Sequence, residues 1–446
     1  MKRVVILCVL LLSVASAFAL GKFGDWTCSV ALSGYVSDET GKAPNAFLWI
    51  PEGCEHVNFA VLAQQNMTEE ALLRSPRFRQ KMTELGGALI WVAPWFSQNW
   101  SPQTGCQQTF EEMMVGLAGQ SGHSELVTVP VVPFGHSAQA TFPWNFAAWN
   151  PDRTLCIISF HGDAPRTNLC GYGSANVEWG RTRNIDGIPG LMIEGEYEWW
   201  QARVRPALAF QMMYPKACIS LLCDAGSGHF DLCDATIDYI GLFIQKAYEK
   251  RITTSLPIPL SKGQGGTPTA GEGLERPRLR CLDPSDGWRF GCPVGSDKEG
   301  DPVTSFPKEP PAPWASYTGD PHTAFWYIDE EMARLTAARY AETDGKEGQA
   351  ADIRKLDLRH RIIGDTVRLD SLLAPASPLP NGIGQGVGLY YISGPLRQIG
   401  TDTFEIIPYD CGTDNPKRSH TAWIVAVREG DATHKRTVQP IQIMLK

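Results

Sequence analysis

The chain has 446 residues, of which 43% are hydrophobic and 20% charged, and these proportions exclude a wholly disordered protein. Its 40 basic and 48 acidic residues give a net charge of -8. That balance argues against a nucleic-acid-binding role, because phosphate binding relies on clustered Lys and Arg side chains. No internal repeat or heptad pattern is visible, so solenoid and coiled-coil folds are also excluded.

The N-terminus has the layout of a secretory signal peptide. Lys2 and Arg3 precede an apolar run, and small residues at Ala17 and Ala19 occupy the cleavage positions. We therefore expect cleavage near Ala19 and a mature chain that is secreted or periplasmic. No later apolar stretch is long enough for a membrane span, so we expect none in the mature chain.

Export would permit disulfides among the cysteines. Cys281 and Cys292 flank a short loop and are the expected local pair, whereas Cys28 with Cys54 is a weaker candidate. The cysteines do not show the spacing of a zinc finger or ribbon. We therefore expect no metal and no other cofactor.

Short apolar segments alternate with amphipathic ones from about residue 45 to residue 250. The expected strands are Ala46–Ile50, Val57–Leu62, Ala88–Val92, Val127–Phe134, Leu155–Phe160, Gly190–Ile193 and Ala217–Leu222. The clearest expected helices are Thr68–Leu85 and Asp234–Arg251. This alternation predicts an α/β fold with a mostly parallel sheet and helices on both faces.

The pattern changes after residue 255. Residues 256–320 are rich in Pro and Gly and are expected to form a connection, followed by a helix over Phe325–Tyr340. From Arg359 onward, short alternating segments predict a small β-rich domain that packs on the rest. The predicted division is a signal peptide (1–19), an α/β domain (20–255), the connection (256–320), and a helix with a β-rich C-terminal domain (321–446).

The segment from Gly135 to Ala140 has the composition of a turn that exposes a nucleophilic serine. An expected strand ends at Phe134 and leads directly through Ser137 into an expected helix. Such a turn requires very small residues near the serine, because the strand and helix backbones nearly touch there. Gly135 meets this requirement, but Gln139 departs from the usual G-x-S-x-G pattern.

Two later strand ends carry the residues that would complete a catalytic triad. The segment "GIPGLMIEGEYE" is acidic after its strand, and "ACISLLCDAGSGHFD" places His229 in a loop after the next strand. The order serine, acid, histidine resembles that of the α/β-hydrolase superfamily over roughly residues 25–255. The resemblance implies Ser137 as nucleophile and His229 as general base.

The resemblance leaves the triad acid and the oxyanion hole less clearly assigned. Counting from the glycine that ends the strand favours Glu198 as the acid, and the alternatives are Glu194, Glu196 and Asp163. The implied oxyanion donors are the backbone N–H of Ala138 and a second donor from Gln65 or Asn66. An equally weighted alternative is that Asn66 only begins the turn into the helix at Thr68.

Other polar and aromatic residues near these segments have simpler interpretations. We expect His136 to face outward from the turn, while the segment that begins with His161 could line the site. Trp199 and Trp200 follow the acid candidate and are expected at the rim of the site. Most tryptophans of the chain are expected to fill cores.

Together these features predict a secreted serine hydrolase that cleaves esters through an acyl-enzyme. The expected substrate is a small-molecule or carbohydrate ester, a guess that depends on resemblance and location alone. A serine peptidase and a non-catalytic binding protein with the same fold remain alternatives. The sequence does not indicate an oligomeric state.

Overall fold

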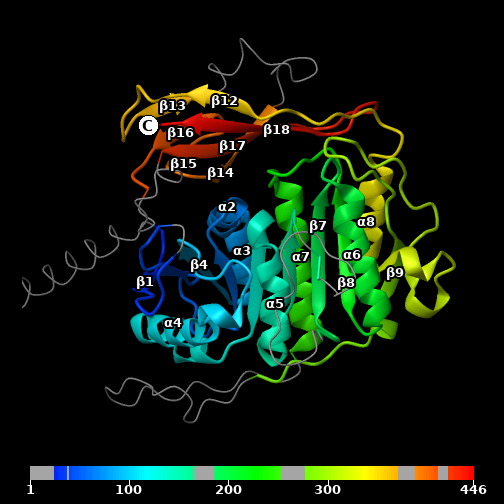
Figure 1. Ribbon diagram of the computed structural model, residues 1–446, viewed down its shortest axis with the longest axis horizontal. Helices are drawn as coiled ribbons and strands as arrows, with labels where there is room; N and C mark the ends of the chain where they lie inside the picture. Colours follow the sequence, from blue (N-terminus) through cyan, green and yellow to red (C-terminus); the bar gives the residue numbers. More distant parts are fainter. Residues whose placement is uncertain are drawn as a thin grey trace, which may run out of the picture.

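A computed structural model describes residues 25–37, 40–162, 164–165, 185–252, 277–369, 387–409 and 420–445. Its centre is an eight-stranded sheet with the order β1-β2-β4-β3-β5-β6-β7-β8 (Figure 1). The strands are β1 (Cys28–Ala31), β2 (Asn45–Trp49), β3 (Phe59–Gln64), β4 (Gly87–Ala93), β5 (Val131–His136), β6 (Ile157–Phe160), β7 (Pro189–Gly195) and β8 (Cys218–Asp224). All seven strands expected from the apolar segments are present.

Most of this sheet is parallel. Each pair from β4 through β3 and β5 to β8 is parallel, whereas β2 runs antiparallel to both β1 and β4. The predicted fold class is therefore confirmed: a mostly parallel sheet of α/β-hydrolase type, with separate β-rich sheets elsewhere. The carboxyl ends of neighbouring parallel strands meet at one edge, where an open α/β sheet places its ligands.

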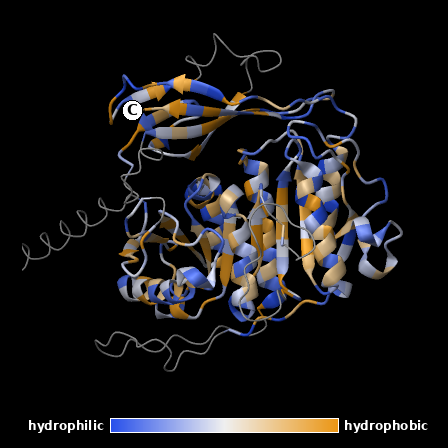
Figure 2. Cartoon of the chain, viewed as in Figure 1, coloured by the Kyte–Doolittle hydropathy of each residue, from blue (hydrophilic) through white to orange (hydrophobic). Residues whose placement is uncertain are grey.

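Side chains of successive strand residues enter two different apolar clusters. In β3, Phe59 and Val61 belong to one cluster, and Ala60 and Leu62 belong to the other. This alternation arises because successive strand side chains point to opposite faces, so both faces of the sheet are covered. Figure 2 shows the apolar strands between helices that are more polar on their outer sides.

The helices of this part lie between or after the strands along the chain, with α2 and α3 adjacent to each other. They are α2 (Thr68–Arg74), α3 (Pro76–Leu85), α4 (Cys106–Ser121), α5 (Thr141–Trp149), α6 (Trp200–Met213) and α7 (Asp234–Arg251). The expected helix Asp234–Arg251 is confirmed as α7. The expected helix Thr68–Leu85 is instead divided in two at Ser75, because Pro76 cannot continue a helix hydrogen-bond ladder but suits a first turn.

Residues 277–345, which include the C-terminal part of the expected connection, pack beside β8. They contain a three-stranded sheet of β9 (Trp288–Gly291), β10 (Ala312–Pro313) and β11 (Ala324–Tyr327), followed by helix α8 (Glu330–Ala341). The Tyr327 hydroxyl donates to the Leu221 carbonyl at 2.6 Å, which joins this segment to the main sheet. The expected helix therefore begins later than Phe325, because the aromatic residues of β11 pair with β9.

The remaining described residues, 354–445, form what we call the C-terminal β unit. It has two sheets, with orders β12-β18-β17-β14 and β13-β16-β15. Its strands are β12 (Arg354–Asp357), β13 (Thr366–Arg368), β14 (Val387–Ser393), β15 (Leu396–Gln398), β16 (Thr403–Ile406), β17 (Thr421–Arg428) and β18 (Thr437–Met444). Figure 1 shows this unit across the top of the α/β part, on the side to which β7 points.

The nine cysteines among the described residues are all free thiols. The expected pairs Cys281 with Cys292 and Cys28 with Cys54 are therefore wrong. Cys292 is largely buried and its Sγ donates to the Pro293 carbonyl at 3.1 Å, whereas Cys281 is exposed, so the two thiols occupy different environments. The expected signal peptide lies outside the described residues. Within the part of the chain that the structure describes, no helix is long and apolar enough to cross a membrane.

Candidate active site

Ser137 lies on a sharp turn between β5 and α5. Its φ angle is 54°, in the left-handed region that non-glycine residues adopt rarely and mainly at strained functional sites. A Cβ atom at Gly135 would overlap the Gln139 carbonyl oxygen, so this position requires glycine. Ser137 is half-buried and Ala138 is exposed, which leaves the hydroxyl accessible from the carboxyl edge of the sheet.

The departure at Gln139 is accommodated by a second glycine after the neighbouring strand. The close contact with this turn is made by Gly162, where an added Cβ would overlap the Ala140 side chain and lie 3.0 Å from the Ser137 carbonyl oxygen. Gln139 itself is buried, at 1% exposure. The small residues that the turn requires are thus Gly135, Ala140 and Gly162.

His229 connects Ser137 to Glu198. The His229 Nε2 atom lies 2.6 Å from the Ser137 Oγ atom, and its Nδ1 atom is hydrogen-bonded to the Glu198 Oε1 atom. A carboxylate only accepts, so we assign the ring proton to Nδ1 and leave Nε2 to accept from the serine hydroxyl. This is the arrangement needed to activate a serine hydroxyl.

The Glu198 carboxylate is buried and held by polar contacts on both oxygens. Its Oε2 atom accepts from the Gly195 N–H at 2.9 Å and lies 3.0 Å from the His161 Nδ1 atom. Burial alone would raise the pKa of Glu198, but His161 and His229 outweigh burial and hold it well below its usual range. The carboxylate is therefore ionised at neutral pH.

The alternative acids have other environments. Glu196 is ion-paired with Lys435 and accepts from the Gly226 N–H at 2.9 Å. Glu194 is fully buried, and neither of its carboxylate oxygens has a hydrogen-bond partner in the part of the chain that the structure describes. Asp163 lies outside the described residues. Of the three glutamates, Glu198 is the one that meets His229.

The loop after β3 reaches the turn at Ser137. The Asn66 side-chain amide donates to the His136 carbonyl at 2.9 Å, and helix α2 begins without a side-chain cap. Asn66 therefore does more than begin the turn into α2, because its side chain also contacts the turn that carries Ser137. Both kinds of Gln65 donor are engaged, since its backbone N–H donates to Val92 at 2.8 Å and its side chain to Tyr409 at 2.6 Å.

Glu69 adds a second connection between this loop and the nucleophile turn. Its Oε1 atom accepts from the His136 N–H at 2.8 Å, and its Oε2 atom accepts from the Met67 N–H at 2.7 Å. The side chain is fully buried at the start of α2. Sequence analysis did not identify Glu69, because an acidic residue in the first turn of a helix is ordinary.

Two expectations about neighbouring residues are wrong. His136 is fully buried, and its Nε2 atom donates to the His229 carbonyl at 2.8 Å instead of facing outward. Burial, helped by repulsion from His229 and His161, lowers the pKa of His136 well below its usual value, so its ring is neutral. Trp200 is 1% exposed and donates to Pro293, and so lies in the core rather than at a rim.

The comparisons with known proteins concern solved structures, since no family model and no curated protein matches the chain. Est1E from Butyrivibrio proteoclasticus is 14% identical, with a TM-score of 0.32 over 50% of this chain and 99% of its own. The serine hydrolase FphF of Staphylococcus aureus is 12% identical, with a TM-score of 0.33 over 50% of this chain and 97% of its own. The siderophore hydrolase EstA from Aspergillus nidulans is 9% identical, with a TM-score of 0.32 over 49% of this chain and 93% of its own.

The sheet order, the strained turn at Ser137 and the position of each site residue after a parallel strand identify the architecture. The chain has the α/β-hydrolase fold. In this fold Ser137, His161, Glu198 and His229 follow β5, β6, β7 and β8, four strands that are neighbours in the sheet. His161 is the residue of this row to which sequence analysis assigned no definite role.

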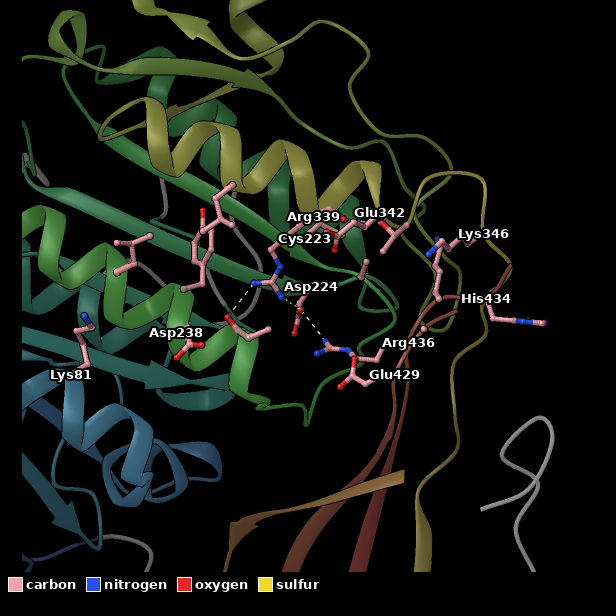
Figure 3. A pocket seen from close by; sticks show the side chains of 18 residues that line it. Lys81, Cys223, Asp224, Asp238, Arg339, Glu342, Lys346, Glu429, His434 and Arg436 are labelled. Carbon is pink, nitrogen blue, oxygen red and sulfur yellow. Dashed lines mark hydrogen bonds and ion pairs between the residues drawn. The ribbon is translucent and has the colours of Figure 1, made fainter. Parts of the chain in front are cut away.

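A hollow of about 780 Å³ lies elsewhere, between α7, α8 and the turn that joins β17 to β18 (Figure 3). Its lining includes Asp224, which pairs with Arg339 and with Arg436, but none of Ser137, Glu198 and His229. The hollow is therefore separate from the group of side chains around Ser137. Among the described residues no cluster of His, Cys, Asp and Glu could hold a metal ion.

Proposed function

We propose that this protein is a serine hydrolase that cleaves carboxylic esters through an acyl-enzyme intermediate. The observation that carries the proposal is the continuous chain of hydrogen bonds from Ser137 through His229 to Glu198. A serine on a strained turn, next to a neutral acceptor nitrogen and a buried ionised carboxylate, has the environment of an activated nucleophile.

The proposed reaction has two halves. In the first, the Ser137 oxygen attacks the ester carbonyl carbon while its proton passes to the His229 Nε2 atom, and Glu198 stabilises the imidazolium that forms. The imidazolium then gives that proton to the departing alcohol oxygen, which leaves an acyl group on Ser137. In the second half, His229 takes a proton from a water molecule whose oxygen attacks the acyl carbon. The bond from that carbon to the Ser137 oxygen then breaks, the imidazolium returns the proton to the serine oxygen, and the carboxylic acid is released.

Negative charge on the substrate oxygen would be stabilised by backbone N–H groups. We assign one donor to Ala138, which follows the nucleophile at the N-terminal end of a helical turn. Of the two candidates in the loop after β3, Asn66 is favoured over Gln65, because the Gln65 N–H is already bonded to Val92. The proposed substrates are extracellular small-molecule or carbohydrate esters, with a peptide bond as the alternative.

The deciding experiment is covalent labelling with a fluorophosphonate probe, which reacts only with an activated serine. We expect the wild-type protein to be labelled and Ser137→Ala and His229→Ala not to be. Ser285→Ala, at an exposed serine away from the site, is the control and should label normally. A folded wild-type protein that resists the probe would overturn the proposal and favour a binding role.

A second experiment tests the acid and the bond that is cleaved. Glu198→Gln should lower kcat by roughly 10³- to 10⁴-fold with little change in KM, because a neutral amide cannot stabilise the imidazolium. The assay compares p-nitrophenyl acyl esters with aminoacyl amides. Faster turnover of the amides would replace the esterase assignment with a peptidase assignment.

A further inference from the structure

His161 occupies an unusual backbone conformation next to the proposed triad. It follows β6, its N–H donates to the Ile193 carbonyl at 2.7 Å, and its side chain is fully buried. Its φ angle is 48°, and Ser137 and His161 are two of the three non-glycine residues with φ near +50° in the described ranges. A strained conformation persists only where the surrounding structure holds it, and such strain clusters at functional sites.

The His161 ring contacts the triad acid on the side away from the base. Its Nδ1 atom lies 3.0 Å from the Glu198 Oε2 atom, whereas the Oε1 atom is bonded to His229. A glutamate has one more side-chain torsion than an aspartate, so its carboxylate needs more restraint to keep one orientation. The Gly195 N–H donates to Oε2, and His161 contacts the same oxygen at ion-pair distance. Together they restrain Oε2 and leave Oε1 to the base.

We propose that His161 is a positioning residue of the hydrolase: it holds the second oxygen of Glu198 in place and shares that carboxylate with His229. This inference depends on the proposed function. It assigns two separate tasks to one imidazole, a geometric task that requires contact with Oε2 and an electrostatic task that requires a positive charge.

The charged and titratable groups around His161 come from every strand end packed against it. They are His136 at the end of β5, Glu198 after β7, and Asp224 and Asp231 at and after β8, while Glu194 and His229 lie close to Glu198. Burial lowers the pKa of His161, but Glu198, Asp224 and Asp231 outweigh it and raise the pKa above its ordinary value. The ring is therefore charged in the pH range in which a catalytic imidazole titrates.

Both rings contact the Glu198 carboxylate, His161 at Oε2 and His229 at Oε1. Removing the charge of His161 leaves that carboxylate to His229 alone. Since a general base acts only in its unprotonated form, we expect the acid limb of the pH profile of kcat/KM to move upward in variants that lack this charge.

Two substitutions separate the two tasks while tolerating the positive φ angle. His161→Gly removes the side chain, and His161→Asn retains a short N–H donor without the charge. We expect H161G to lower kcat by roughly 10- to 100-fold with KM nearly unchanged, because the acid loses its orientation. In both variants the acid limb should move to higher pH by roughly half a unit or more, and H161N should retain most of the kcat.

His123→Ala is the matched control, since His123 also contacts a glutamate, Glu125, at 2.8 Å but lies outside the site. It should leave kcat and the pH profile unchanged. An acid limb that stays at the wild-type position in both H161N and H161G overturns the electrostatic task. A kcat for folded H161G equal to that of H123A overturns the geometric task.

Fluorophosphonate labelling separates a failure of this inference from a failure of the proposed function. If the wild-type protein is labelled at Ser137 but H161G and H161N have wild-type kinetics, the role of His161 is rejected and the proposed function stands. If H161G does not fold, H161N is compared with wild type. An acid limb of H161N at higher pH supports the role of the His161 charge, and an acid limb at the wild-type position overturns it.

Discussion

At the scale of single residues, Glu194 shows how burial controls the ionisation of a carboxyl group that lies outside the proposed triad. Its carboxyl group is fully buried in β7, close to the ionised Glu198 and without a hydrogen bond to the described residues. Burial first, and then repulsion from Glu198, raise the pKa of Glu194 well above its ordinary value of 4.5. The group is therefore neutral in the folded protein at pH values where it is ionised in the unfolded chain.

This difference predicts a stability that falls as pH rises. Above the ordinary pKa the unfolded chain loses the Glu194 proton while the folded protein keeps it, so ionisation favours unfolding. Glu194→Gln should remove this effect, with an unfolding midpoint above that of wild type at pH 8 and close to it at pH 4. Urea denaturation at both pH values is the measurement, with the exposed Glu299→Gln as control. A Gln variant less stable than wild type at pH 8 would contradict the prediction.

At the scale of elements, the strand-turn-helix at Ser137 depends on the absence of a Cβ atom at Gly135. Gly135→Ala would place that atom against the Gln139 carbonyl, which belongs to the backbone and cannot move without opening the turn. Gly119 is a contrasting glycine in α4, exposed and with no atom within 4 Å of an added Cβ. The two glycines therefore predict opposite results for the same substitution.

We expect G135A to lose fluorophosphonate labelling and to be destabilised by about 1–3 kcal/mol or more, as for other overpacked sites. G119A should keep full labelling and gain about 0.5–1 kcal/mol, because alanine is the better helix former. Labelling and urea unfolding of the two variants in parallel provide the comparison. Normal labelling of G135A would show that the turn has room that the structure does not indicate.

At the scale of the whole molecule, the C-terminal β unit is tied to the loops on both sides of Ser137. Arg436 pairs with Asp224 at 2.9 Å and with Asp231 at 2.6 Å, just after His229 in the sequence. Phe230 and Trp423 stack with ring centroids 5.0 Å apart. On the other side, Tyr409 bonds Gln65. These contacts make the unit a structural part of the site rather than an independent module.

Removing Arg436 should therefore destabilise the α/β part and not only the unit that carries it. Arg436→Met leaves the buried Asp231 without its cation, a change that typically costs about 3–5 kcal/mol. The matched control is Arg359→Met, in an exposed pair with Asp357 in the same unit, which should leave the unfolding midpoint unchanged. Thermal unfolding measures both, and equal midpoints for the two variants would contradict the prediction.

The sequence by itself determined the features that depend on short stretches of chain. Continuous apolar segments predict buried parallel strands, and α7 has the bounds expected from its own periodicity. Gly135 before Ser137 indicates a tight turn. The serine, acid and histidine segments were found for the same reason, because each follows a strand and the carboxyl ends of parallel strands share one edge.

The tertiary structure alone decided which side chains meet at that edge. Contacts between distant segments show that Glu198, of three nearby glutamates, bonds His229 and that His161 is its second partner. The same kind of contact buries His136 and Trp200 and places the Cys281 and Cys292 thiols in different environments. Local patterns specify which elements form and which faces are apolar. The environment of a charge or thiol is instead set by groups that reach it from other strands, and those groups are known only once the strands are assembled.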